Sequence, residues 1–286
     1  MATKMNQLAV IDHSNLLPIV PSAEDLAAIR EELSDMDRVP YGRIKIAAGG
    51  VNIFQVFEPG EEEAVPAQTI EGVIMLSHKS NGLWSKPFGS GDSKVPDCSS
   101  IDGVYGTVTE TGETGEIVEC ASCPCNAFGS AKGGEGRGKA CKNMRRLYIM
   151  RRGDIFPMVL TLPPTALSAY DSYRTKVMLG RKKMANVMTR ISLKSAQNKD
   201  GVAYSTPIFE AVGVLDGVEA AAMRAYSEAL NSSAQRVGVT ADDAPADVQQ
   251  EAAKPTATVV DADAAAEVQA AFAEQDASQD DFAPLA

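Results

Sequence analysis

The sequence predicts a mainly β fold with flanking helices, in the α+β class. Three observations lead to this prediction. Short stretches of alternating apolar and polar residues, typical of β-strands, are separated by glycines and prolines. Helical periodicity is confined to three segments. A long region between the strands is rich in Gly, Ser and Cys with little periodicity of either kind, so a hydrophobic core alone does not account for it.

The N-terminal part predicts one helix and two regions of strand. Residues 21–36 have helical periodicity, and residues 41–57 and 68–79 are strand-like. We therefore assign residues 1–40 to an N-terminal arm with a helix. The folded core is expected to begin at residue 41.

Regular structure resumes after the insert 80–142, which is rich in Gly, Ser and Cys. The patterns predict strands over 145–153, 155–163, 186–196 and 203–215, and helices over 163–180 and 216–230. Five or six strands with a helix before the penultimate strand suit a small Greek-key barrel of the OB type. We assign residues 41–230 to this OB-like core.

The C-terminal segment, residues 231–286, changes in composition to Ala, Asp, Gln and Ser. It cannot bury enough apolar area to offset the entropy of ordering, so we expect a disordered acidic tail. The tail ends in "DDFAPLA". An acidic tip with apolar residues can dock in a partner's pocket, and the alternative is a solubilising tail. The candidate partner-binding residues are Asp280, Asp281, Phe282, Pro284 and Leu285.

The net charge of −11 conceals a strong segregation of charge along the chain. Residues 132–199 carry 16 Lys or Arg against 3 Asp or Glu, a local +13. Residues 231–286 carry 2 against 11, a local −9. A basic block inside an acidic protein predicts a polyanion site, because it concentrates positive potential where phosphates would lie. The alternative is a solvated basic surface that balances acidic neighbours.

The stretch "MRRLYIMRRG" carries the most specific part of the basic block. Alternation places Arg146, Tyr148 and Arg152 on one strand face. Guanidinium groups for phosphates and a ring for base stacking are the components of a single-strand binding groove. A half-buried core position is the alternative for Tyr148. The candidate nucleic-acid-binding residues are Lys139, Lys142, Arg145, Arg146, Tyr148, Arg151, Arg152, Arg181, Lys182, Lys183, Arg190 and Lys194.

All 5 cysteines fall in the insert, in "VPDCSS", "VECASCPCNAFGS" and "GRGKACKNMRR". Zn²⁺ prefers four soft or borderline ligands in a tetrahedron. One Cys-x-x-Cys turn supplies two of them, and flanking cysteines close the site. This spacing predicts a zinc knuckle held by Cys98, Cys120, Cys123 and Cys141. Cys125 competes with Cys123 as a ligand, and a redox pair or buried structural thiols are the alternatives.

The stretch "GGEGRGKAC", residues 133–141, matches the first seven places of the phosphate-binding motif G-x-x-x-x-G-K-[ST]. Ala140 stands where a hydroxyl should bind Mg²⁺, and the following "KNMRRLYIM" predicts a strand instead of the helix that holds the phosphates. An ATPase is therefore not expected. On the zinc interpretation, the glycines let the chain turn sharply back toward the metal.

These features together resemble those of phage-type single-stranded DNA-binding proteins, such as the helix-destabilising protein of T-even phages. Residues 40–215 resemble these proteins in the expected order of elements and the cysteine-rich insert. Residues 276–286 resemble them in the acidic character of the tail. It implies an OB-fold core with an embedded zinc element and an acidic tail. The tip is also similar to that of bacterial single-stranded DNA-binding proteins. The sequence departs in two respects: its zinc ligands are all cysteines, whereas the T-even site includes a histidine, and Phe282 precedes the proline instead of following it.

The sequence thus predicts a non-enzymatic, largely sequence-tolerant single-stranded DNA-binding protein. It would protect DNA in phage or mobile-element replication and recombination and recruit partners through its tail. The chain has only 2 histidines and no Ser/His/Asp spacing or metalloprotease motif. The alternatives are a zinc-ribbon adaptor that contacts proteins in transcription or replication, and a nucleic-acid enzyme with a structural cysteine cluster. The sequence shows no membrane-spanning apolar run and no secretory signal, so the expected compartment is the cytoplasm, that of the bacterial host for a phage-encoded protein.

Overall fold

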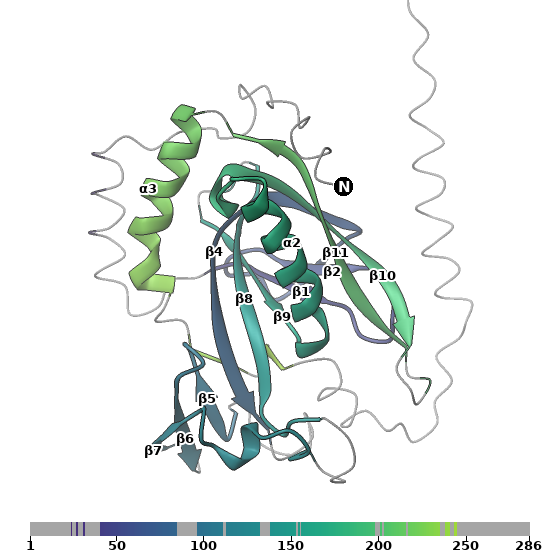
Figure 1. Ribbon diagram of the computed structural model, residues 1–286, viewed down its shortest axis with the longest axis vertical. Coiled ribbons are helices and arrows are strands. Elements are labelled where there is room, and N and C mark those ends of the chain that lie inside the picture. The colour runs from purple at the N-terminus through teal and green to yellow at the C-terminus, as the bar shows by residue number, and fades with distance from the viewer. Residues whose placement is uncertain are drawn as a thin grey trace, which may run out of the picture. The chain divides into compact units, whose positions relative to one another are not determined.

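Figure 1 shows the computed structural model of the protein. It describes Glu24, Ala27 and Glu31, the ranges 41–84, 96–110, 113–131, 138–152, 156–197, 203–215, 217–234 and 238–240, and residues 154, 201, 243 and 244. All of these residues belong to one compact unit, residues 1–252. The described chain is mainly β with flanking helices, as the sequence predicts, and its strands form an open mixed sheet.

The described sheet has 11 strands. In chain order they are β1 (Arg43–Ile46), β2 (Phe54–Phe57), β3 (Val65–Ala67), β4 (Thr69–Leu83), β5 (Cys98–Ser100), β6 (Tyr105–Glu110), β7 (Glu113–Glu119), β8 (Lys142–Met150), β9 (Met158–Leu162), β10 (Val187–Gln197) and β11 (Ala203–Val214). The helical elements after residue 120 are η3 (Pro124–Asn126), η4 (Pro164–Ala166), α2 (Leu167–Leu179), η5 (Met184–Asn186) and α3 (Gly217–Ala234).

β4 is the central strand of the sheet. One edge pairs antiparallel with β8, and the other edge pairs with β10 near its start and with β5 near its end. The order across the sheet is β3-β2-β1-β9-β8-β4-β5-β6-β7, and the β10–β11 hairpin branches from β4. β1 and β9 pair in parallel, whereas their other partners are antiparallel. Among the described strands β11 pairs with β10 alone, so the sheet stays open.

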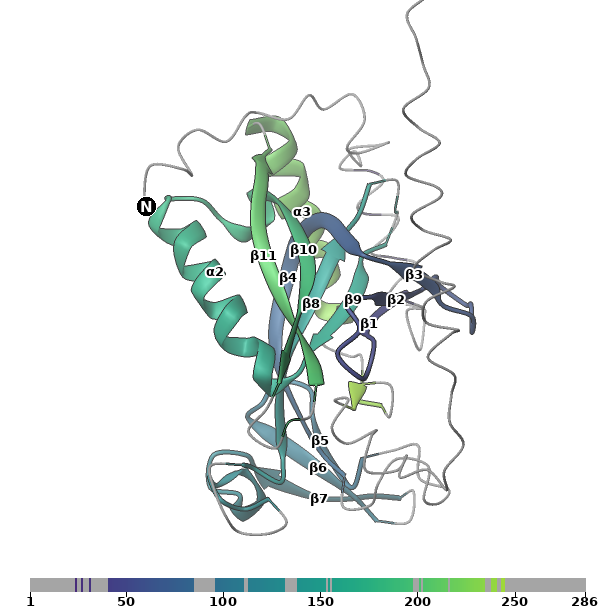
Figure 2. The same cartoon turned by 90° about the vertical axis from the view of Figure 1, so that its right-hand side faces the viewer.

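β8 is buried on both faces, which explains its apolar run "LYIM". Leu147 and Ile149 belong to an apolar cluster with residues of α2, whereas Tyr148 and Met150 belong to a second cluster with residues of α3. The two helices lie on different sides of the β4–β8 pair (Figures 1 and 2). A strand face that alternation alone would leave open to solvent is therefore covered by α3.

The helices differ from the expected ranges at their ends. Of the helix expected over 21–36, the structure describes three residues, and all three are helical. The helix expected over 163–180 is preceded by the 3-10 turn η4 and begins at Leu167. Gly180 is its C-cap, but the left-handed conformation falls on Arg181, with a φ of 55°. The left-handed residue that ends the helix is thus Arg181, one position after the glycine that the sequence offers for this role.

The C-terminal boundary also moves. α3 continues to Ala234, past the boundary expected at residue 231. Beyond the helix, Val239 and Ala244 are buried, with 6% and 5% of their surface exposed. The first part of the expected tail therefore packs on the sheet, where Val239 and Ala244 are shielded from solvent. The remaining residues of that segment, 245–286, with the candidate partner-binding tip, lie outside the described residues.

Candidate nucleic-acid interface and cysteine pocket

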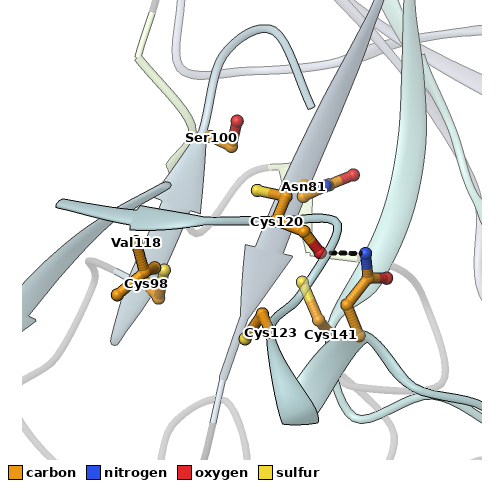
Figure 3. Close-up of a pocket in the computed structure, with 8 residues that line it drawn as sticks. Asn81, Cys98, Ser100, Val118, Cys120, Cys123 and Cys141 are labelled. Carbon is orange, nitrogen blue, oxygen red and sulfur yellow. Dashed lines mark hydrogen bonds between the residues drawn. The ribbon is translucent and has the colours of Figure 1, made fainter. Parts of the chain in front are cut away.

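The insert 80–142 contains three short strands and a pocket. β5, β6 and β7 extend the sheet from the end of β4. The four cysteines selected by their spacing line one pocket: Cys98 on β5, Cys120 after β7, Cys123 before η3 and Cys141 before β8 (Figure 3). Asn81, Ser100, Val118 and Asn126 complete the lining, and Cys125 does not take part in it.

Hydrogen bonds around Cys125 shape the pocket. The Cys141 amide and the Ser130 hydroxyl both donate to the Cys125 carbonyl, each at 2.8 Å. The side-chain amide of Asn126 donates to the Cys120 carbonyl at 2.7 Å. Cys125 thus holds the turn through its backbone, while Cys120 and Cys141 present their side chains to the pocket.

Burial keeps two of the pocket thiols in their neutral form. Desolvation, followed by repulsion from the neighbouring cysteines, raises the pKa of Cys98 to about 11 and that of Cys141 to about 12. Within the described part of the chain, no group of three or more His, Cys, Asp or Glu side chains is arranged to hold a metal ion. Zinc binding at this pocket remains a prediction.

Lys139, the lysine of the "GGEGRGKAC" loop, supports the pocket from outside. Its ammonium group donates to the side-chain oxygens of Asn126 at 3.1 Å and Asn143 at 3.0 Å, and it lies 4.6 Å from the centre of the Phe128 ring. Asn143 donates in turn to Asn81 on β4 at 2.9 Å. The lysine therefore ties the cysteine turn to β4 and β8, and a phosphate would have to displace these amide partners.

The strand face expected to bind nucleic acid is covered. Tyr148 is 0% exposed and packs edge-on against Tyr41, and Arg146 is 1% exposed. The expectation that both side chains project from an open face is wrong, because α3 and the residues that follow it lie over this part of β8. Arg152, expected on the same face, is exposed just beyond the end of the strand.

Several other predicted cations already have carboxylate partners. The pairs are Arg145 with Asp171, Arg151 with Glu58 and Asp154, and Arg190 with Glu71 and Glu210. The structure therefore does not bring the predicted basic residues into one groove. Of the others, Arg181, Lys183 and Lys194 are exposed, and Lys142 and Lys182 are half-buried.

The cations that the structure brings together lie on the α3 side of five adjacent strands, and Arg146 is the one among them that the sequence predicted. Arg43 on β1 pairs with Phe57 on β2 and, in parallel, with β9. Arg146 on β8 pairs with Thr161 on β9 and His78 on β4. Side chains of paired residues point to the same face of a sheet, and every second residue joins them. The resulting cationic face comprises Arg43, Lys45, Phe57, His78, Arg146, Tyr148 and Thr161.

The charges of this face act on one another. Lys45 and Arg43 lie 5.0 and 5.2 Å from the centre of the Phe57 ring. Burial, and then the charge of Arg43, lowers the pKa of Lys45. Burial also lowers the pKa of His78, and the charge of Arg146 lowers it further. Positive charges that lie this close together on one face concentrate a positive potential there, which favours an anionic ligand.

Sequence reasoning missed this face although part of its signal was present. In "YGRIKI" the basic residues Arg43 and Lys45 alternate with Ile44 and Ile46, which indicates a strand with one apolar and one basic face. The pattern does not predict that β1 pairs with β9, so it could not bring these cations beside Arg146.

No protein-family model, no curated protein and no solved structure matches this chain. None of the helices that the structure describes has the length and apolar character needed to cross a membrane. The function is therefore inferred from the chemistry of the cationic face and the cysteine pocket.

Proposed function

We propose that the protein binds single-stranded nucleic acid, with DNA as the expected ligand, on the cationic face. The observation that carries this proposal is the placement of Arg43 and Lys45 on β1 beside the Phe57 ring of β2, with Arg146 two strands away on the same face of the sheet. Cations bind phosphates, and an aromatic ring stacks on any base. Binding is therefore expected to be largely sequence-tolerant and to involve no catalysis.

The order of the strands supports the proposal. β4, β8 and β9 form an antiparallel meander, α2 follows, and the β10–β11 hairpin returns to β4. An OB barrel has the same order of a three-stranded meander, a helix and a returning pair of strands. Its second and third strands provide the nucleic-acid-binding face. β8 and β9 correspond to those strands and carry Arg146 and Thr161. An OB-like core is thus part of the proposal, with β1 on the edge of β9 where the last strand would close a barrel.

The wider role follows from the resemblance of the sequence. The protein would protect single-stranded DNA in phage or mobile-element replication and recombination. The C-terminal segment carries a local charge of −9 and repels phosphates. Its tip "DDFAPLA" would therefore serve a protein partner and not the DNA.

We also propose that the cysteine pocket binds one structural Zn²⁺ through Cys98, Cys120, Cys123 and Cys141. Four thiols around one pocket match the donor set of a closed structural zinc site. Two of the four lie in one turn and the others come from either side in the sequence, so the metal would join three separate parts of the insert.

A titration of fluorescein-labelled oligo(dT) tests nucleic-acid binding. Each phosphate contact contributes about −0.7 to the slope of log affinity against log salt concentration. Replacing both Arg43 and Lys45 by Ala should weaken binding at least about tenfold and make the slope shallower by about 1.4 units. Lys194→Ala removes an exposed cation from β10, outside the cationic face, and should change affinity less than about twofold. Equal losses in the two variants, or no binding at low salt, would contradict the proposal.

A protein-binding adaptor is the second candidate, because the cysteine element exposes apolar side chains. Tyr105 and Ile117 on the β6–β7 hairpin are 59% and 70% exposed, and Phe128 near the pocket is 71% exposed. Exposed apolar side chains that gather on one element mark a protein-binding surface. Absence of oligo(dT) binding, together with a protein partner whose binding is lost in Ile117→Ser, would favour this function.

A further inference from the structure

Asp243 lies on the cationic face, although it belongs to the acidic C-terminal segment. Its carboxylate accepts hydrogen bonds from the Arg146 guanidinium and the Thr161 hydroxyl, each at 2.6 Å, and from the Thr240 backbone amide at 2.9 Å. The Gly238 carbonyl accepts a further bond from Arg146 at 2.6 Å. The Arg146 and Asp243 side chains are 1% and 12% exposed, so salt screens their ion pair little.

The groups that hold Asp243 form a binding site for an oxyanion. The guanidinium of Arg146 and the hydroxyl of Thr161 belong to β8 and β9, so strands of the sheet, and not the C-terminal segment, carry them to this position. Lys45 on β1, which pairs with β9, contributes a further cation to the same face of the sheet; burial lowers its pKa, and the charge of Asp243 offsets part of that lowering. Phosphate oxygens accept the same charge-assisted hydrogen bonds as a carboxylate, and arginine is well suited to both.

Arg43 and Lys45 lie on the same sheet face as Arg146, beside the Phe57 ring. A strand of nucleic acid on this face can therefore contact several cations at once. The carboxylate is tethered a short way beyond α3, which gives it a high effective concentration at the site. A strand that engages several cations at once can displace it, whereas a single free phosphate competes poorly.

We propose that Asp243 occupies a phosphate-binding subsite, and that a backbone phosphate of single-stranded nucleic acid replaces it on Arg146 and Thr161. This inference rests on the proposed function, and it names both the position of one phosphate and the residue that yields it. Val239 and Ala244 are buried on the sheet beside the carboxylate. Exchange of the ligand therefore requires residues 238–240, 243 and 244 to move away from the strands.

The substitution Asp243→Asn tests the exchange. It keeps the size of the side chain but removes the charge that competes with phosphate. Loss of one charge-assisted hydrogen bond to the competitor should let oligo(dT) bind about tenfold more tightly at low salt. The matched control is Asp171→Asn, which removes the same charge from the neighbouring Arg145 on the α2 side of β8. The control should change affinity less than about twofold.

A second measurement uses the unaltered protein, so it does not depend on how well a variant folds. Replacement of the carboxylate releases the Thr240 amide from Asp243. Addition of oligo(dT) should therefore speed amide hydrogen exchange over residues 238–244 several-fold, while the amides of β8 stay protected. Thermal unfolding of Asp243→Asn, run in parallel, corrects its affinity for any fraction of unfolded chain.

The outcomes separate this inference from the proposed function. If the wild-type protein binds oligo(dT), but Asp243→Asn has unchanged affinity and exchange over 238–244 does not rise, the inference is overturned and the proposed function stands. An equal gain in Asp243→Asn and Asp171→Asn reflects net charge alone and also overturns it. If neither the wild type nor Asp243→Asn binds oligo(dT), both the inference and the proposed function fail.

Discussion

The two ends of β4 are stabilised by different means. Near its start, the strand lies between β8 and β10, and apolar clusters cover both faces of the sheet. Near its end it meets the cysteine element, β5 to β7 with η3. There, Pro96 apart, the buried apolar side chains described between residues 96 and 141 are Cys120 and Cys141. So little buried apolar surface contributes little to the stability of the cysteine element. The proposed zinc would supply the missing stabilisation by joining its separate segments.

Loss of the proposed zinc should give the largest difference in stability between the two ends of β4. Structural zinc contributes on the order of 10–16 kcal/mol of apparent binding free energy, so chelation or Cys120→Ser should unfold the cysteine element. β8 and β9 should stay folded, because their contacts are apolar. Elemental analysis should give one zinc per chain, and hydrogen exchange should show the loss of protection confined to β5–β7.

Cys125→Ser is the control for the zinc prediction, because Cys125 is not among the residues that line the pocket and holds the turn through its backbone carbonyl. It should retain zinc and protection. Equal effects of Cys120→Ser and Cys125→Ser would mean a different ligand set. Protein without zinc, in which all five thiols titrate freely, would end the proposal.

Two tyrosines offer the next test of the comparison. Tyr148 is fully buried in the sheet, whereas Tyr105 in the cysteine element is 59% exposed. Tyr148→Ala should lower the free energy of unfolding by about 3–5 kcal/mol, as expected for a large buried aromatic side chain, and Tyr105→Ala by less than about 0.5 kcal/mol. Urea unfolding followed by circular dichroism measures both.

The tyrosine test also reverses an expectation drawn from the sequence. With Tyr148 as a stacking residue, its replacement would weaken oligonucleotide binding and leave the melting temperature nearly unchanged. The buried ring predicts the opposite: a large loss of stability, with affinity per folded molecule little altered. An unchanged melting temperature with weaker binding would place the ring back among the DNA contacts.

The smallest expected effect concerns His78, midway along β4. Burial lowers the pKa of this histidine in the folded protein. Below its unfolded pKa of about 6.5 the unfolded chain binds a proton that the folded chain resists, so stability is full above that pH and declines as pH falls. His78→Gln should remove this part of the decline between pH 7.5 and 5.5, measured by urea unfolding.

Local patterns predicted the elements that pack in the usual way. Alternation over 186–196 matches β10, and the helical segment 216–230 matches most of α3. The spacing of the cysteines selected the four that line the pocket, because a tight Cys-x-x-Cys turn restricts where its partners can approach. The short strands β5 to β7 escaped notice, since glycines and threonines interrupt the apolar alternation on which strand prediction depends.

Contacts between distant segments were beyond local patterns. Alternation correctly groups Arg146 with Tyr148 on one face of β8, but it does not say what covers that face. This face is covered by α3 and by Asp243, which is 97 residues away from Arg146 along the chain. For the same reason the sequence does not predict that Arg43 and Lys45 lie beside Arg146, because their proximity depends on the pairing of β1 with β9.

The parallel pairing of β1 with β9 also orders the events of folding. Arg43 on β1 pairs with Val159 on β9, so β1 leaves the ribosome long before its partner exists. At about 5–20 residues per second, β1 waits roughly ten seconds for that strand. Closing such a long loop is slow, and the local β8–β9 hairpin should form first. β1 therefore joins late and brings Arg43 and Lys45 with it, so a nascent chain gains the cationic face only when most of its length has been synthesised.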